Sequence, residues 1–283
     1  MHIQIKKELK KSRAFKAGVA LLSTVLLAAL FAPWLAFYDP MQQTMTSLLN
    51  PSWIHLLGTN HVGQDIWSQL LYGARTSLII GFAVGIISTV LATFFGVSTA
   101  LIGGAYDKIV MRIVDALIII PAVIVAILFA AYFKPNVLLL ILLLSSLTWQ
   151  GGARVVRAQV LSLKNSGHIV AAGAFGASRV YLAMHHIVPE LGPIILVDFI
   201  HGVRRAVFME AGLAFLGISD PMVISWGIMM RESMNFSFLN VWQWWLVPTG
   251  IALSITIVGL TLIGYTFEPI LDPRLRGALI AAN

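Results

Sequence analysis

The sequence predicts an all-α, polytopic membrane protein with six transmembrane helices, and two observations carry this prediction. The chain has 283 residues, of which 58% are hydrophobic and only 11% are charged, whereas a soluble domain carries about 25% charged residues. The chain also contains several apolar runs of the length needed to cross a bilayer, which is roughly 20 residues. Because so few charges cannot cover a water-exposed surface, the composition excludes an ordinary soluble enzyme.

Six apolar runs account for the predicted helices. Five of them contain no charged side chain, and a polar turn at residues 134–136 separates the third from the fourth. The fifth run is less regular, because Asp198, Arg204 and Arg205 interrupt it. With six spans, both ends of the chain lie on the same side of the membrane. The predicted spans are residues 17–37, 76–106, 116–133, 135–153, 190–211 and 246–267.

The distribution of basic residues predicts the orientation. Lys and Arg are concentrated in the cytoplasmic segments of membrane proteins. Most of the 19 basic residues fall in alternate segments that include the amino terminus. We therefore expect a multi-pass protein of the cell inner membrane, surrounded by lipid, with both termini in the cytoplasm. The basic residues of the predicted inner segments are Lys6, Lys7, Lys10, Lys11, Arg13, Lys16, Lys108, Arg112, Arg154, Arg157, Lys164, Arg179, Arg274 and Arg276.

What the chain lacks excludes several kinds of chemistry. It contains no cysteine, so disulfides and thiolate metal sites are excluded. It has no Gly-x-x-x-x-Gly-Lys-Ser/Thr loop for nucleotide phosphates and no His-Glu-x-x-His pair for zinc. The net charge of +7 follows the membrane segments instead of forming the clustered basic face of a nucleic-acid-binding protein. We expect no enzyme activity, no cofactor bound by this chain, no metal site and no nucleic-acid partner.

The predicted inner segment at residues 154–188 contains a helix rich in small residues. Residues 167–178 are mostly Gly and Ala. Because such a helix carries little side chain, another protein surface can approach its backbone closely. The alternative is a simple connector between two spans, and the residues alone favour neither interpretation.

Seven short segments, in order along the chain, resemble the permease subunits of ATP-binding-cassette (ABC) importers of the dipeptide, oligopeptide and nickel family. Near residues 167–178 the sequence is similar to that family's Glu-Ala-Ala motif, although Val170 stands at its leading glutamate and Gly173 at its basic residue. Asn60 and Gln64 stand where the family usually has an acid and an arginine. The matching segments are residues 55–65 with 71–78, 111–121, 149–164, 171–189, 210–217 with 225–227, 244–248 and 272–276.

The resemblance implies an ABC type I importer permease fold and a division of the chain into three parts. These are the amino terminus, first span and outer segment (1–72), the permease domain (73–268) with a coupling loop near 154–188, and a cytoplasmic tail (269–283). It also implies a heterodimer with a second permease, two ATP-binding-cassette ATPase subunits that hold ATP and Mg²⁺, and an extracytoplasmic substrate-binding protein. The coupling helix that contacts the ATPase would comprise Gly167, His168, Ala171, Ala172, Gly173, Gly176 and Ala177.

The charged residues of the fifth span are the candidates for a translocation path. Asp198, His201 and Arg205 are spaced i, i+3 and i+7, which predicts one helical face. A charge near the bilayer centre costs at least about 2.5–3.5 kcal/mol, so it normally faces protein or a wet cavity. We expect this face to line the path and Arg204 or Arg205 to meet substrate carboxylates. The alternatives are an Asp198–Arg205 pair that stabilises a subunit interface, and arginines that reach outward to the membrane surface.

Three questions stay open at this stage. Glu210, at the outer end of the fifth span, is either an exposed helix-end carboxylate or a contact for the substrate-binding protein. The substrate is either a di- or oligopeptide or nickel, and Val170 favours the metal branch, including metal chelates, weakly. The rival functions are an ion-coupled secondary transporter with Asp198 and His201 as a proton relay, and a membrane scaffold that transports nothing.

Overall fold

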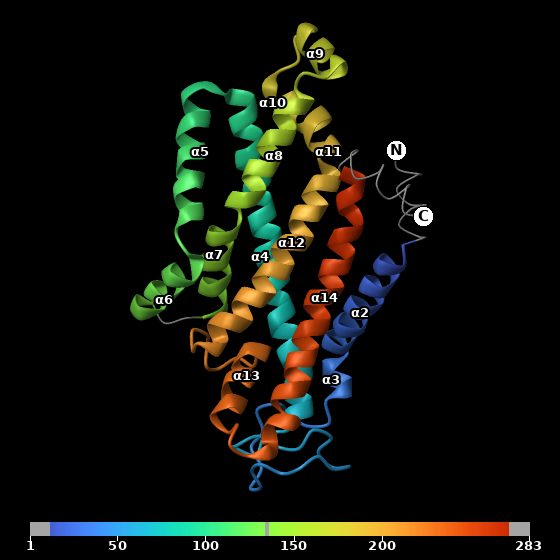
Figure 1. The fold of residues 1–283 in the computed structure, drawn as a ribbon, viewed down its shortest axis with the longest axis vertical. Coiled ribbons are helices and arrows are strands. Elements are labelled where there is room, and N and C mark those ends of the chain that lie inside the picture. The colour runs from blue at the N-terminus through green and yellow to red at the C-terminus, as the bar shows by residue number, and fades with distance from the viewer. Residues whose placement is uncertain (1–11, 134–135, 272–283) are drawn as a thin grey trace.

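The computed structural model describes residues 12–133 and 136–271, and every regular element within them is helical. The long helices run side by side, with α4 and α12 in the middle of the bundle and α9 beyond one end (Figure 1). Some residues used above lie outside the described ones, so the structure does not bear on them. These are Lys6, Lys7, Lys10, Lys11, Lys134, Arg274, Arg276 and the tail from residue 272 onward.

The helices agree with six membrane spans. Three helices are long and apolar enough to cross a membrane alone, and three bent pairs are long enough if each pair is one span. The long helices are α2 (Arg13–Leu30), α4 (Ile66–Ile102) and α14 (Leu246–Leu271). The pairs are α5 (Gly104–Ile119) with α6 (Ala122–Tyr132), α7 (Val137–Thr148) with α8 (Gln150–Leu163), and residues 179–190 with α12 (Gly192–Phe215).

The predicted bounds of two spans are wrong for physical reasons. Helix α4 begins ten residues before the predicted start at 76, because the Asp65 carboxylate caps it by accepting a hydrogen bond from the Ser68 backbone N–H at 2.8 Å. The predicted third span, 116–133, is not one straight helix. Pro121 lies between α5 and α6, which are bent by 79°, since proline disfavours helical backbone in the residue before it.

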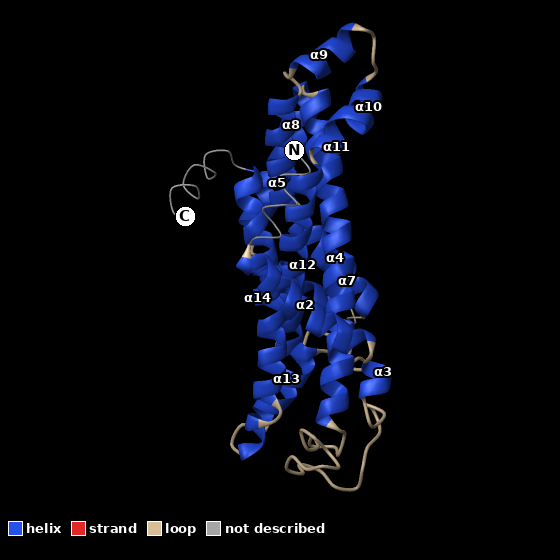
Figure 2. Ribbon diagram, turned by 90° about the vertical axis from the view of Figure 1, so that its right-hand side faces the viewer, coloured by secondary structure: helices blue, strands red, loops and turns tan. Residues whose placement is uncertain are grey.

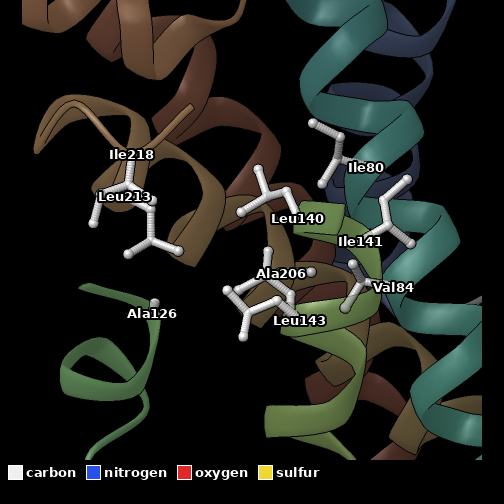
Figure 3. Close-up of a cluster of buried hydrophobic side chains, with 10 residues drawn as sticks. Ile80, Val84, Ala126, Leu140, Ile141, Leu143, Ala206, Leu213 and Ile218 are labelled. Atoms are coloured by element: carbon white, nitrogen blue, oxygen red, sulfur yellow. The ribbon is translucent and has the colours of Figure 1, made fainter. Parts of the chain in front are cut away.

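Glycines on α4 permit close packing against α12. A Cβ atom on Gly81 would lie 2.4 Å from Val207 Cγ2, and one on Gly85 would lie 2.5 Å from Val203 Cγ2. Small residues four apart let membrane helices approach in this way. Figure 3 shows the adjoining apolar cluster, to which α4, α6, α7 and α12 all contribute side chains, including Val84, Ala126, Leu140 and Ala206.

The two ends of the bundle differ in construction (Figure 2). At one end, α8 leads to α9 (Gly167–Ala174), α10 (Arg179–Leu182), the π-helix η1 (Ala183–Ile187) and α11 (Val188–Glu190), which joins α12. At the other end, α2 leads through α3 (Ala32–Leu35) into a long loop at 36–65. This loop lies beside α13 (Trp226–Asn235) and the 3₁₀ turn η2 (Asn240–Gln243). We call the loop together with α13 and η2 the outer cap.

Candidate functional site

Helix α9 packs on the rest of the bundle through one buried apolar side chain, Ile169. Ile169 is buried and packs in a cluster with Val97 of α4, Val156 and Val160 of α8, and Ile187 of η1. Several other apolar side chains of this region are exposed. Phe175 is 92% exposed, and Val170, Val180 and Met184 are also exposed. The tip of the bundle therefore presents apolar surface that the described part of the chain does not cover.

The small residues of α9 are not required by packing within the described chain. A Cβ atom on Gly167 or Gly176 would meet nothing within 4 Å, and one on Gly173 would meet only Leu182 Cδ1 at 4.0 Å. Ala171, Ala172 and Ala177 lie on the same short segment, at least partly exposed. The helix predicted over 167–178 ends at Ala174, because Gly176 adopts a left-handed conformation with φ of +89°.

A polar link ties α9 to the start of the fifth span. His168 Nε2 lies 2.7 Å from Glu190 Oε1 at the end of α11, and both side chains are about half exposed. Tyr181 stacks on His185 with ring centroids 4.3 Å apart, next to His186. These contacts connect α9 with α10, η1 and α11, so this end of the chain is a folded unit and not a loose connector.

The charged residues of α12 do not all share one environment. A Cβ atom on Gly152 of α8 would lie 2.5 Å from both Asp198 oxygens, so the glycine makes room for this carboxylate. Arg205 is exposed and donates a hydrogen bond to the Thr148 carbonyl at the end of α7, at 3.2 Å. His201 instead lies beside Gly264 of α14. The predicted common face therefore holds for Asp198 and Arg205, while His201 turns toward another helix.

The two arginines of α12 bond to neighbouring helices, and the alternative of an Asp198–Arg205 ion pair is not formed. Arg204 donates a hydrogen bond to the Thr261 hydroxyl of α14 at 3.3 Å. Within the described residues, no ion pair shorter than 4.0 Å joins Asp198 to Arg205, although the two charges interact at longer range. Arg205 thus lies near the middle of a membrane helix, held by a carbonyl and open to the outside of the chain.

Glu210 is neither exposed nor at a helix end, so the first of the two interpretations left open for it is wrong. It lies inside α12, five residues before the end at Phe215, and is 1% exposed. Its Oε2 accepts a hydrogen bond from the Ser77 hydroxyl of α4 at 3.0 Å. Ser77 Oγ in turn accepts the backbone N–H of Trp226 at the start of α13, at 3.3 Å. A buried carboxylate at this place holds helices together and offers no surface to a docking protein.

Two ion pairs between α5 and α8 were missed by sequence reasoning. Arg157 donates to both carboxylate oxygens of Asp107, each at 2.6 Å, and Arg154 pairs with Asp115. The only available signal was that two acids of one predicted inner segment and two arginines of the next carry opposite charges. Pairing partners about 40 to 50 residues apart requires the helix arrangement.

Amide side chains replace the charges expected by resemblance in the outer cap. Asn60 Oδ1 accepts the backbone N–H groups of Val62 and Gln64, at 3.0 and 2.8 Å. Gln64 Oε1 accepts from Asn60 Nδ2 and from Gln69 Nε2, both at 2.8 Å. The turn is therefore built by neutral hydrogen bonds. Among the described residues, no group of three or more His, Asp or Glu side chains is arranged to hold a metal ion.

A bundle of apolar helices with charged residues inside one span and an uncovered apolar tip is the architecture of a multi-pass membrane permease. Residues 92–277 match the family described as the binding-protein-dependent transport system inner membrane component. Residues 4–51 match the N-terminal transmembrane domain of oligopeptide transport permease C. The chain belongs to this family of inner membrane permeases and has the ABC type I permease fold.

Individual relatives align over nearly the whole chain. A peptide transport system permease protein of Brucella suis biovar 1 (strain 1330) is 35% identical over 95% of this chain and 91% of its own length. The oligopeptide permease OppC of Bacillus subtilis (strain 168) is 33% identical over 94% of this chain and 88% of its own length. The dipeptide permease DppC of the same organism is 31% identical over 95% and 85%.

Proposed function

We propose that this chain is the permease subunit of an ATP-driven importer of di- or oligopeptides. The relatives described above are named for peptides, dipeptides and oligopeptides, which favours peptides over nickel or a metal chelate. The structural observation that carries the proposal is the uncovered apolar tip around Phe175. A soluble ATPase subunit is the partner that such a tip fits, with ATP and Mg²⁺ held by that partner.

The fold supports a direct mechanical connection from the tip to the membrane interior. Helix α9 is anchored through Ile169 on α4 and α8, and His168 links it to Glu190. Because α11 leads into α12 after one residue, a displacement of α9 acts on the helix that carries Arg204 and Arg205. ATP-driven closure of two ATPase subunits would then tilt α12 against a second permease subunit, which is the alternating access expected of such a transporter.

Arg205 is the side chain that best fits contact with the substrate. An arginine exposed near the middle of a membrane helix is unfavourable in lipid, so it faces a partner subunit or a wet cavity. With its Nη1 on the Thr148 carbonyl, the guanidinium keeps other N–H donors for a carboxylate. Every peptide with a free carboxyl end supplies that group. Arg204 already donates a hydrogen bond to Thr261, so it is the weaker candidate for contact with the substrate carboxylate.

The orientation and localisation follow from the basic residues. We assign both termini, α9 and the inner ends of α5 and α8 to the cytoplasm, and the outer cap to the side from which a substrate-binding protein delivers the peptide. In this arrangement Asp198 packs against Gly152 and supports the helix contact. A proton relay with His201 is less well supported, because His201 turns toward α14.

The ATPase contact is tested with the variant Phe175→Ala in the complex of this chain with its partner subunits. Because the ring is almost fully exposed, the chain should fold normally, while the yield of co-purified ATPase and the rate of peptide uptake should fall about tenfold or more. Ile79→Ala removes another exposed apolar side chain, on α4 and distant in sequence from α9, and should change neither quantity. Normal co-purification and uptake with Phe175→Ala would exclude this tip as the ATPase contact.

The translocation path is tested separately with Arg205→Ala and Arg205→Lys. Both variants should insert normally, and uptake of a peptide with a free carboxyl end should fall more with Ala than with Lys. A peptide amidated at its carboxyl end should be affected less. Uptake kinetics that are unchanged at normal expression would contradict the role of Arg205. Uptake that follows an ion gradient and resists vanadate would instead establish the ion-coupled alternative.

A further inference from the structure

A groove between α5 and α8 carries more positive than negative charge. It is lined by four basic residues, two acidic ones and three apolar ones. Two of the basic residues, Arg154 and Arg157, are neutralised by Asp115 and Asp107. The lining residues are Asp107, Lys108, Ile109, Met111, Arg112, Ile113, Asp115, Arg154 and Arg157.

The remaining positive charge belongs to Lys108 and Arg112. Both side chains are exposed and form no hydrogen bond or ion pair with another described residue. They are four residues apart on α5, so they lie on the same face of the helix. Lys164, at the end of α8, lies within electrostatic range of Asp107 and adds a third basic group nearby. The groove therefore carries a net positive charge that attracts an anionic ligand.

Apolar surface continues from this charge toward the membrane interior. Ile109 and Ile113 stand next to Lys108 and Arg112 and are both more than half exposed. Ile119, at the end of α5, and Ile120, just after it, are exposed as well. Helix α5 lies at the edge of the bundle (Figure 1). The exposed face thus changes from basic at the inner end to apolar in the span.

We infer that this groove binds an anionic phospholipid of the inner leaflet, with the headgroup phosphate on Lys108 and Arg112 and the acyl chains along Ile109, Ile113 and Ile119. Charge complementarity identifies the occupant, since basic pockets between membrane helices on the cytoplasmic side select anionic headgroups. The inference rests on the proposed orientation, which brings the inner end of α5 to the cytoplasmic surface. The two ion pairs hold α5 on α8 and so keep the groove open.

The test uses the full-length chain purified with its partner subunits. Native mass spectrometry measures the retention of phosphatidylglycerol relative to phosphatidylethanolamine. We expect wild type to retain phosphatidylglycerol preferentially and Lys108→Gln/Arg112→Gln to lose the preference about fivefold per charge removed. The swap Lys108→Arg/Arg112→Lys, which keeps both charges, should retain it. The matched control Lys16→Gln/Arg179→Gln removes two exposed basic side chains outside the groove and should also retain it.

Several outcomes would overturn the inference. Equal loss in the control would mean that overall positive charge, and not the groove, selects the lipid. Loss in the charge-keeping swap would show that the two positive charges do not select the lipid, which contradicts binding through the headgroup phosphate. Displacement of the lipid by inorganic phosphate would assign the groove to a free phosphate. A photoreactive amino acid at Ile113 should crosslink to lipid, and crosslinking to the second permease would identify a protein interface instead.

The orientation is checked independently, so its failure can be told apart from failure of the lipid site. The chain has no cysteine, which allows single cysteines to be introduced at Trp53→Cys in the outer cap and at Arg179→Cys after α9. A membrane-impermeant maleimide added to intact cells should label the first and not the second. The reverse labelling would overturn the orientation, and with it the inner-leaflet lipid, even if the groove binds an anion in detergent.

Discussion

The glycines at the two ends of the bundle differ in how closely other atoms surround them. In the outer cap, a Cβ atom on Gly58 would lie 2.1 Å from the Leu49 carbonyl oxygen, and one on Gly63 would lie 2.3 Å from that of Thr44. Around α9, the same addition at Gly167 or Gly176 meets empty space. The glycines of the outer cap are therefore held tightly by contacts within the chain, whereas the described residues leave open space beside Gly167 and Gly176. A methyl group added to a glycine should consequently have different effects at the two ends.

The largest expected effect is at Gly58 in the outer cap. Gly58→Ala places a side chain at a φ of +71° and drives it into backbone, which cannot move like a flexible side chain. We expect the free energy of unfolding to fall by about 3–5 kcal/mol, at the upper end for one substitution. Thermal unfolding of the purified chain measures this. A normal melting temperature would show that the outer cap is not tightly packed.

Asp65 should have the next largest effect. Its carboxylate accepts the Ser68 N–H and hydroxyl and pairs with buried His55 at 2.9 Å. Asp65→Ala removes the cap of α4 and leaves His55 without its partner, for a loss of about 2–3 kcal/mol. Asp65→Asn keeps an oxygen for the cap and should lose less. Equal unfolding midpoints for the two variants would mean that the cap contributes nothing.

A glycine-to-alanine substitution, which destabilises the outer cap at Gly58, should instead stabilise the chain at the α9 end. Gly167→Ala adds a methyl group to the first turn of α9, in open space, and should stabilise the isolated chain by up to about 1 kcal/mol. If a partner approaches this backbone closely, the variant should nevertheless reduce assembly with the ATPase. Measuring both the melting temperature and the co-purified ATPase separates the two effects. A lower melting temperature would contradict the open environment of Gly167.

The smallest expected effect is a pH dependence in the outer cap. Burial raises the pKa of Glu232, and this shift is partly opposed by His61 and Arg231. A raised pKa means that stability is complete below the ordinary glutamate pKa and is lost as the pH rises through the raised value. The outer cap should therefore be more stable in mild acid than at neutral pH. Glu232→Gln should remove this dependence, as unfolding midpoints measured across that pH range would reveal.

The sequence was sufficient for the features that depend on local composition. Membrane spans require long apolar runs, so six were predicted and the helices agree with that number. Bends and helix ends depend on single residues outside those runs. Pro121 bends one span, and the Asp65 cap extends α4 beyond its apolar part. Neither effect can be seen in hydropathy alone.

Predicting the site from the sequence was limited by distance along the chain. One interpretation placed Glu210 at an exposed helix end because Gly212 follows two residues later, but its partner Ser77 lies 133 residues earlier. The direction of His201 depends on Gly264 of another helix. By contrast, the small residues at 167–177 form one continuous segment and could be recognised directly. The roles of Glu210 and His201 depend on contacts between helices, which the residue types alone do not reveal.

The length of α4 has a consequence for how the two ends communicate. It is one helix of 37 residues without a proline, about 55 Å long, and so exceeds the roughly 30 Å of bilayer hydrocarbon. A rigid rod of this length that turns by about 10° around its middle displaces each tip by about 5 Å in opposite directions. Any swing of the end near α9 therefore carries the outer cap the opposite way, with no hinge to absorb it.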